Sequence, residues 1–188
     1  MGEEPELIVA DVLAWRDWLD RHEHASEGVW LVLAKKGVLG PTSLTYAQAL
    51  EEALCSGWID GQKRGRDAAT FLQRFTPRRR RSLWSLRNIG IVERLIEEGR
   101  MRERGHAEVA AARADGRWER AYPGAVAAQA PPDLLEALAA SPAALARFES
   151  LGSQGRYSVL FPLMTAPDDA VRRRRLERAV EALERGEG

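Results

Sequence analysis

Apolar positions recur along the chain with two different periods. After Asp11 they follow the spacing i, i+3, i+7, which predicts a helix over residues 11–22. Residues 29–34 form a continuous apolar run rich in β-formers, which predicts a strand. Thr45 and Gln48 have the spacing of a capping box, in which each side chain bonds the backbone N–H of the other, and an amphipathic pattern follows. A second helix is therefore expected there.

The rest of the chain divides in the same way. Residues 58–63 and 70–75 are typical of two more strands, and amphipathic helices are expected over about 85–98 and 105–115. Residues 122–132 hold three prolines and a glycine, which indicates a linker or a crossing loop. Every later segment has a helical pattern.

These elements predict an α+β fold with a small, mainly antiparallel sheet at about residues 29–75, surrounded by helices, and an all-helical C-terminal third. Residues 130–188 are expected to contain no strand. The predicted organisation is an α+β core domain over 1–121 and a helical subdomain over 122–188, packed together as one compact unit.

Composition narrows the class of protein. The longest apolar stretch has six residues, far short of the ~20 that span a bilayer, and the acidic N-terminus does not resemble a secretory signal. We therefore expect a cytoplasmic protein with no membrane span. The single cysteine, Cys55, excludes an intramolecular disulfide. His22 and His24 have no further His or Cys nearby to complete a zinc site, so neither a metal nor another cofactor is predicted.

Charge is balanced in total but not along the chain. The 28 basic and 28 acidic residues cancel, yet residues 60–88 carry nine basic side chains against two acidic ones. Such a segment can form an anion-binding face, and the run Arg78–Arg81 is the part that nucleic acid would contact. Because the total charge is zero and no known nucleic-acid-binding motif occurs, we do not predict nucleic-acid binding; a module that uses this run is kept as an alternative.

Several motifs resemble a known family. Gly57-Trp-Ile-Asp-Gly61 and Arg74-Phe-Thr-Pro-Arg78 are the most specific, and Ser82-Leu-Trp-Ser-Leu-Arg-Asn88 follows them with familiar spacing. Together with the Arg-rich segment 166–176, they resemble the YdeI/OmpD-associated family, often called bacteriocin-protection proteins, over nearly the whole chain. The resemblance implies a role in bacterial tolerance of bacteriocins and cationic antimicrobial peptides. It supplies no catalytic residues to carry over.

Charged and aromatic side chains concentrate around the same motifs. Groups of this kind that converge on aromatic walls form pockets for polar ligands, and an arginine can stack on tryptophan or pair with a carboxylate or phosphate. The hypothesis is a site for a small molecule or an antimicrobial peptide. An alternative stays open, in which Asp60 pairs with Arg64 or Arg74 to brace a hairpin and the tryptophans are core. The candidate residues are Lys36, Tyr46, Glu52, Trp58, Asp60, Arg64, Arg74, Arg78 and Trp84.

Evidence for catalysis is weaker. Cys55 has no neighbouring histidine in the sequence and lies among small apolar residues, which is typical of a buried structural thiol. No nucleophile elbow, phosphate-binding loop or dinucleotide fingerprint occurs. The sequence therefore does not predict an enzyme, and an acid–base role for Glu52 or Asp60 is kept as an alternative.

Overall fold

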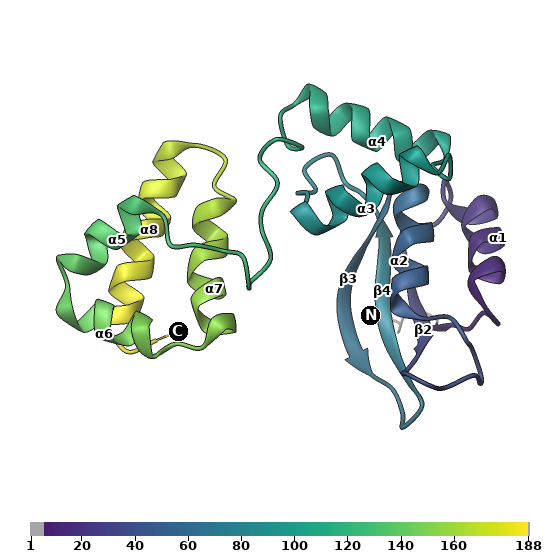
Figure 1. Ribbon diagram of the computed structural model, residues 1–188, viewed down its shortest axis with the longest axis horizontal. Helices are drawn as coiled ribbons and strands as arrows, with labels where there is room; N and C mark the ends of the chain where they lie inside the picture. Colours follow the sequence, from purple (N-terminus) through teal and green to yellow (C-terminus); the bar gives the residue numbers. More distant parts are fainter. Residues whose placement is uncertain (1–5, 188) are drawn as a thin grey trace. The chain divides into compact units, whose positions relative to one another are not determined.

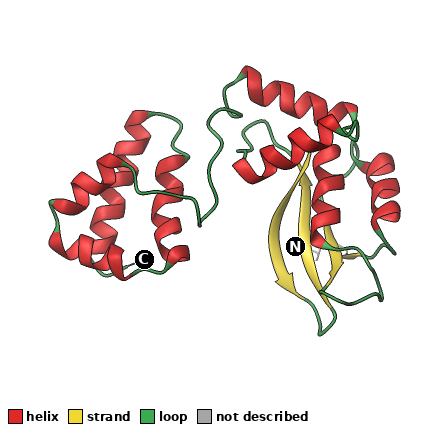
Figure 2. Cartoon of the chain, in the orientation of Figure 1, coloured by secondary structure: helices red, strands yellow, loops and turns green. Residues whose placement is uncertain are grey.

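The computed structural model describes residues 6–187, which fold into two compact units. The N-terminal unit contains the chain up to Ser82 together with Asn88–Glu119. The C-terminal unit contains Leu83–Arg87 and the chain from Arg120 onward. All the strands belong to the N-terminal unit, as Figure 2 shows.

The sheet has four strands in the order β1-β2-β4-β3: β1 (Glu6–Leu7), β2 (Val29–Ala34), β3 (Trp58–Gly65) and β4 (Thr70–Pro77). Strand β4 pairs antiparallel with both β2 and β3, and the short β1 pairs parallel with β2. The predicted α+β class with a mainly antiparallel sheet is confirmed. The two-residue β1 lies outside the predicted range of the sheet, since two residues are too few to show a period.

Strand β3 contains an irregularity that the sequence did not reveal. Its register with β4 shifts between Asp60 and Lys63, so Gly61 and Gln62 form a bulge. The buried side-chain amide of Gln73 donates to the carbonyl oxygens of Gly61, at 2.8 Å, and Gln62, at 3.2 Å. These bonds satisfy the two carbonyl groups at the bulge, where the regular pairing of the strands is interrupted.

Four helices accompany the sheet: α1 (Val12–His22), α2 (Tyr46–Cys55), α3 (Leu86–Glu97) and α4 (Glu103–Ala114). The capping box predicted at the start of α2 is confirmed, because the Thr45 hydroxyl accepts from the N–H of Gln48 while the Gln48 side chain accepts from the N–H of Thr45. Helices α1 and α2 lie side by side against one face of the sheet (Figure 1).

The core of the N-terminal unit lies between these two helices and the sheet. Trp15 of α1 is fully buried, and its indole N–H donates to the carbonyl of Ala49 in α2 at 3.1 Å. Its ring also packs on Phe75 of β4 with a centroid distance of 5.7 Å. One side chain thus contacts both helices and the sheet.

Helix α4 packs unusually close to the end of α2. A Cβ atom on Gly105 would lie 2.2 Å from the carbonyl oxygen of Cys55, so only glycine permits this approach. The backbone N–H of Arg102 donates to the same carbonyl at 3.0 Å. This contact fixes the segment that carries Arg100 and Arg102 beside α2.

The C-terminal unit contains four further helices: α5 (Pro132–Ala139), α6 (Pro142–Ser150), α7 (Ser153–Met164) and α8 (Asp169–Glu184). No strand occurs between residue 130 and residue 187, as predicted. Apolar side chains from all four helices form a separate core. Its buried members are Leu134, Leu138, Ala144, Phe148, Leu160, Leu163 and Leu183.

Candidate functional site

Two of the predicted site residues meet at the junction of α2 and β3. The hydroxyl of Tyr46, the first residue of α2, donates to a carboxylate oxygen of Asp60 at 2.7 Å. Asp60 pairs across the sheet with Phe75, whose ring packs on α1. Paired residues point to the same face of a sheet, so Asp60 faces the helices.

Asp60 and Arg74 lie on opposite faces of the sheet. Arg74 precedes Phe75 in β4, and successive side chains of a strand alternate between faces. Arg74 pairs instead with Trp30, on the face away from the helices. The guanidinium of Arg64 stacks on that same Trp30 ring, 4.1 Å from its centroid. Asp60, Arg64 and Arg74 therefore do not converge on one pocket.

Glu52 lies in an ion-pair network rather than at an open site. Its side chain is 7% exposed, and its two carboxylate oxygens accept from Arg100 at 2.8 Å and Arg102 at 2.9 Å. Arg102 also pairs with Asp20 of α1 at 2.6 Å, and Arg100 pairs with Glu51 at 2.9 Å. The network ties α1, α2 and the segment between α3 and α4 together.

Cys55 lies next to this network. Burial, and then the charge of Glu52, raise the pKa of the Cys55 thiol to about 11. A thiol with that pKa is almost entirely protonated at neutral pH, and the thiolate is the reactive form. This environment suits a structural cysteine.

Trp58 belongs to an aromatic stack that includes residues outside the predicted site. Its fully buried ring meets Trp18 edge to face at a centroid distance of 5.8 Å, and Trp18 is stacked between Trp15 and His22. Within residues 6–187, the indole nitrogen of Trp58 has no hydrogen-bond partner. Trp58 is thus part of the core beneath α1.

No direct bond links the remaining candidates to Asp60 within residues 6–187. Lys36 is exposed in the loop after β2. Arg78 is only 4% exposed, and its backbone N–H donates to the carbonyl of Gly57, so it does not join the exposed neighbours 79–81 in one basic surface. Trp84 belongs to the C-terminal unit. Among the predicted site residues, Tyr46 and Asp60 are joined by a direct hydrogen bond.

A half-buried carboxylate that was not among the predicted site residues lies near Gly57. Burial raises the pKa of Glu108 in α4, while the charges of Arg78, Arg104 and Arg117 oppose that rise. A Cβ atom on Gly57 would lie 3.0 Å from the Glu108 side chain. The acid therefore lies against the Gly57-Trp-Ile-Asp-Gly61 motif.

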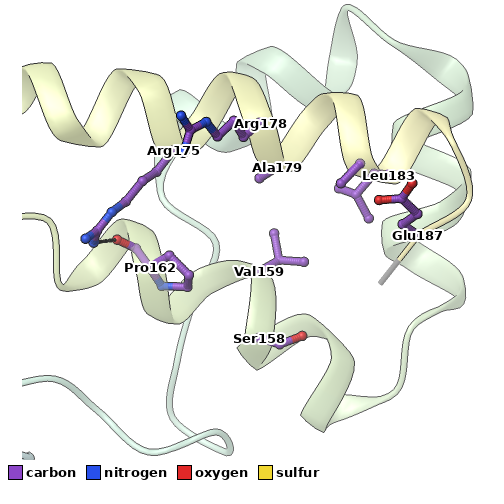
Figure 3. A pocket seen from close by; sticks show the side chains of 9 residues that line it. Ser158, Val159, Pro162, Arg175, Arg178, Ala179, Leu183 and Glu187 are labelled. Carbon is purple, nitrogen blue, oxygen red and sulfur yellow. Dashed lines mark hydrogen bonds between the residues drawn. The ribbon is translucent and has the colours of Figure 1, made fainter.

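The C-terminal unit contains a cavity of about 330 Å³ between α7 and α8. Figure 3 shows Val159 of α7 and Ala179 and Leu183 of α8 pointing toward one another across it. The volume is at the lower end of the range typical of small-molecule sites. This site was not predicted from the sequence, because its apolar residues look like ordinary core positions. Its lining residues are Ser158, Val159, Pro162, Arg175, Arg178, Ala179, Ala182, Leu183 and Glu187.

Two arginines of α8 bond the C-terminal end of α7. Arg175 reaches the carbonyl of Pro162 at 2.6 Å (Figure 3), and Arg172 reaches the carbonyl of Leu163 at 2.8 Å. Arg172 also forms a bidentate pair with Asp133 of α5, with both distances 2.8 Å. Carbonyls in the last turn of a helix have no intrahelical partner, so these bonds satisfy them.

Within residues 6–187, no group of three or more His, Cys, Asp or Glu side chains is arranged to hold a metal ion. None of the helices in that range is long and apolar enough to cross a membrane.

With both units described, the chain is an α+β domain joined to a helical unit that has an open cavity between α7 and α8. The family model of a domain of unknown function, DUF8412, matches residues 7–108, and the model described as "Bacteriocin-protection, YdeI or OmpD-Associated" matches residues 127–186. The chain therefore belongs to the DUF8412 family, and its C-terminal part is of the YdeI/OmpD-associated type. Searches of curated proteins and of solved structures found no match.

The predicted YdeI/OmpD-associated family is thus confirmed, but in a different part of the chain from most of the motifs that suggested it. The Gly57–Gly61 and Arg74–Arg78 motifs fall within the DUF8412 match. The Arg-rich segment 166–176 falls within the bacteriocin-protection match. That match lies wholly inside the C-terminal unit, which holds the cavity.

Proposed function

We propose that this protein is a non-catalytic binding protein that contributes to bacterial tolerance of bacteriocins or cationic antimicrobial peptides. The cavity between α7 and α8 is its binding site. The observation that carries the proposal is the position of this cavity: all but one of its lining residues fall within the segment that matches the bacteriocin-protection family, and the last, Glu187, adjoins it.

The shape and chemistry of the cavity support this assignment. Small-molecule sites are concave and mostly apolar, with a few polar groups that orient the ligand. Here the wall consists mainly of aliphatic side chains, and charged groups come from Arg175, Arg178 and Glu187. The cavity is thus built as a ligand site would be.

The groups most suited to chemistry in the N-terminal unit already have partners inside the protein. Both carboxylate oxygens of Glu52 bond arginines, and Asp60 accepts from Tyr46. The Cys55 thiol is buried, with its pKa raised to about 11. These pairings favour a structural role for that unit and a non-catalytic role for the protein.

The test is a tolerance assay in a bacterial strain that lacks the native gene and expresses single variants. Ser158 is exposed on α7 and lines the cavity, so Ser158→Trp adds a ring at the cavity without disturbing the core. Ser153 is an exposed serine of the same helix that does not line the cavity, and Ser153→Trp is the matched control. Equal amounts of folded protein are checked by circular dichroism.

The expected result is that Ser158→Trp lowers survival in the presence of a cationic bacteriocin to that of the strain without the protein, whereas Ser153→Trp protects fully. Full protection by Ser158→Trp would overturn the role of the cavity. Equal survival of strains with and without the protein would overturn the role in tolerance.

A further inference from the structure

The cavity in the C-terminal unit combines an apolar interior with a cation at its edge. Val159, Ala179, Ala182 and Leu183 supply aliphatic surface from α7 and α8. This wall offers no hydrogen-bonding side chain, so the part of a ligand that lies against it must be apolar. The charged groups around it decide the rest of the ligand's chemistry.

Of the three charged residues that line the cavity, two have partners within the protein. Arg175 donates to the carbonyl of Pro162 and so joins α8 to α7 at one end of the cavity (Figure 3). Glu187 is paired with Arg185, with N–O distances of 3.0 and 3.4 Å. The negative charge near the cavity is therefore already compensated.

Arg178 differs from both. It lines the cavity, it is exposed, and its side chain forms no hydrogen bond or ion pair with any residue between 6 and 187. Its guanidinium offers donors in a planar fork that matches a carboxylate. A cation beside an apolar wall is complementary to a molecule with an anionic head and an apolar chain.

We propose that the cavity binds a single-chain amphiphile with an anionic head group of the carboxylic acid class. The chain lies between α7 and α8, and the head pairs with Arg178. The biological meaning of this binding rests on the proposed function, and it makes that function more specific. A cationic peptide would meet a like charge at Arg178, so it is not the molecule that enters the cavity.

Isothermal titration calorimetry on the full-length protein tests the ligand class with three probes that share one chain length. Decanoate has the chain and the anionic head, 1-decanol has the chain with a neutral head, and decyltrimethylammonium has the chain with a cationic head. Decanoate is expected to bind most tightly and decyltrimethylammonium most weakly. Equal affinities for all three would overturn the assignment of the head group.

Two arginine variants locate the head group. Arg178→Gln is expected to weaken decanoate binding about fivefold, the value of an exposed charge pair, and to leave 1-decanol binding unchanged. Arg173 is exposed on the same helix and does not line the cavity, so Arg173→Gln removes the same charge and is expected to change neither affinity. An equal loss of decanoate affinity in both variants would show a general charge effect and would contradict the assignment.

Two further experiments separate this inference from the proposed function. Ser158→Trp is expected to abolish decanoate binding; retained binding would place the ligand elsewhere. Vesicles of phosphatidylglycerol that capture the protein, with no binding of decanoate, would show recognition of a lipid surface and overturn the inference.

If decanoate binds the cavity while Ser158→Trp leaves tolerance intact, the ligand class stands and the proposed function fails. If decanoate does not bind while that variant loses tolerance, the proposed function stands and the ligand class fails.

Discussion

In the N-terminal unit, Glu52, one of the residues predicted to form a binding site, is buried and bonds Arg100 and Arg102. The C-terminal unit contains an apolar cavity. Arg178, whose side chain has no partner among the described residues, lies at the edge of this cavity. The first arrangement uses charge to hold helices together. The second leaves both apolar surface and charge available to a ligand.

The difference shows that a high density of charged and aromatic residues does not by itself identify a binding site. Such residues can satisfy one another, and a buried charge whose partners lie within the protein is not available to a ligand. A site requires surface that the protein does not use for itself. By that criterion the candidate site of this chain is in the C-terminal unit.

The largest effect is expected from Glu52→Gln. Removing one partner of a buried ion pair leaves the other charges uncompensated and costs ~3–5 kcal/mol. Because the side chain of Arg100 is 34% exposed, water can solvate part of the released charge, so we expect a loss near the lower limit. Urea unfolding followed by tryptophan fluorescence measures it, since Trp15, Trp18 and Trp30 all report on the N-terminal unit.

Glu97→Gln is the matched control for this variant. Glu97 is exposed on α3 and has no bonded partner within residues 6–187, so its loss is expected to leave the unfolding midpoint unchanged. A Glu52→Gln protein as stable as the control would show that the network does not hold the unit together, and Glu52 would again be a candidate for function.

A smaller effect is expected at the Tyr46–Asp60 pair. A hydrogen bond to a charged group contributes ~1.5–3 kcal/mol, and this half-buried pair is expected to contribute about 1.5 kcal/mol as the coupling energy between Tyr46→Phe and Asp60→Asn. Unfolding of the single and double variants in urea measures this energy. Unchanged or increased stability of Asp60→Asn, together with lost tolerance, would instead indicate a site held ready for a ligand.

Arg74→Gln sharpens the same measurement. Arg74 lies on the opposite face of the sheet from Asp60, so the effects of the two substitutions on stability are expected to add. A large coupling energy between them would contradict the assignment of the two side chains to different faces.

The smallest effect is expected at the turn between β3 and β4. Asp67 accepts hydrogen bonds from the Thr70 hydroxyl and from the N–H groups of Thr70 and Ala69, and these bonds lower the pKa of the Asp67 carboxyl to about 2. A carboxyl whose pKa is lower in the folded than in the unfolded state stabilises the fold at pH values above its unfolded-state pKa. This contribution is lost as the pH falls through its folded-state pKa.

Asp67→Asn is therefore expected to be slightly less stable than the unaltered protein at neutral pH, with the difference shrinking between about pH 4 and about pH 2. Urea unfolding of both proteins across this range measures the difference. A difference that does not change with pH would show that the turn is held without the charge of Asp67.

The sequence predicted the elements well where one period dominates a segment. The apolar run 29–34 is β2, and the Thr45–Gln48 capping box opens α2 as expected. The positions of side chains across the sheet were harder to predict. Alternation alone assigns Arg74 to the face opposite Phe75, but pairing Asp60 with Phe75 requires the register, and a bulge at Gly61 changes that register.

The cavity could not be predicted because it depends on how α7 and α8 pack. Ala179 and Ala182 have the periodicity of ordinary helix positions, and no local pattern indicates that the space beside them is not filled. In a helix that carries both arginines and glutamates, the spacing of the charges favours ion pairs within the helix itself. Arg172 instead pairs with Asp133, and both Arg172 and Arg175 bond carbonyls of α7, because the closest acceptors belong to other helices.

A nuclear magnetic resonance titration of the full-length, ¹⁵N-labelled protein with decanoate shows directly which of the two units binds the ligand. We expect the largest shifts at amides of residues that line the cavity, such as Val159, Ala179 and Leu183, and no shifts at amides near Tyr46 and Asp60. Shifts concentrated around Tyr46 and Asp60, with none in α7 and α8, would contradict this expectation and place the binding site in the N-terminal unit.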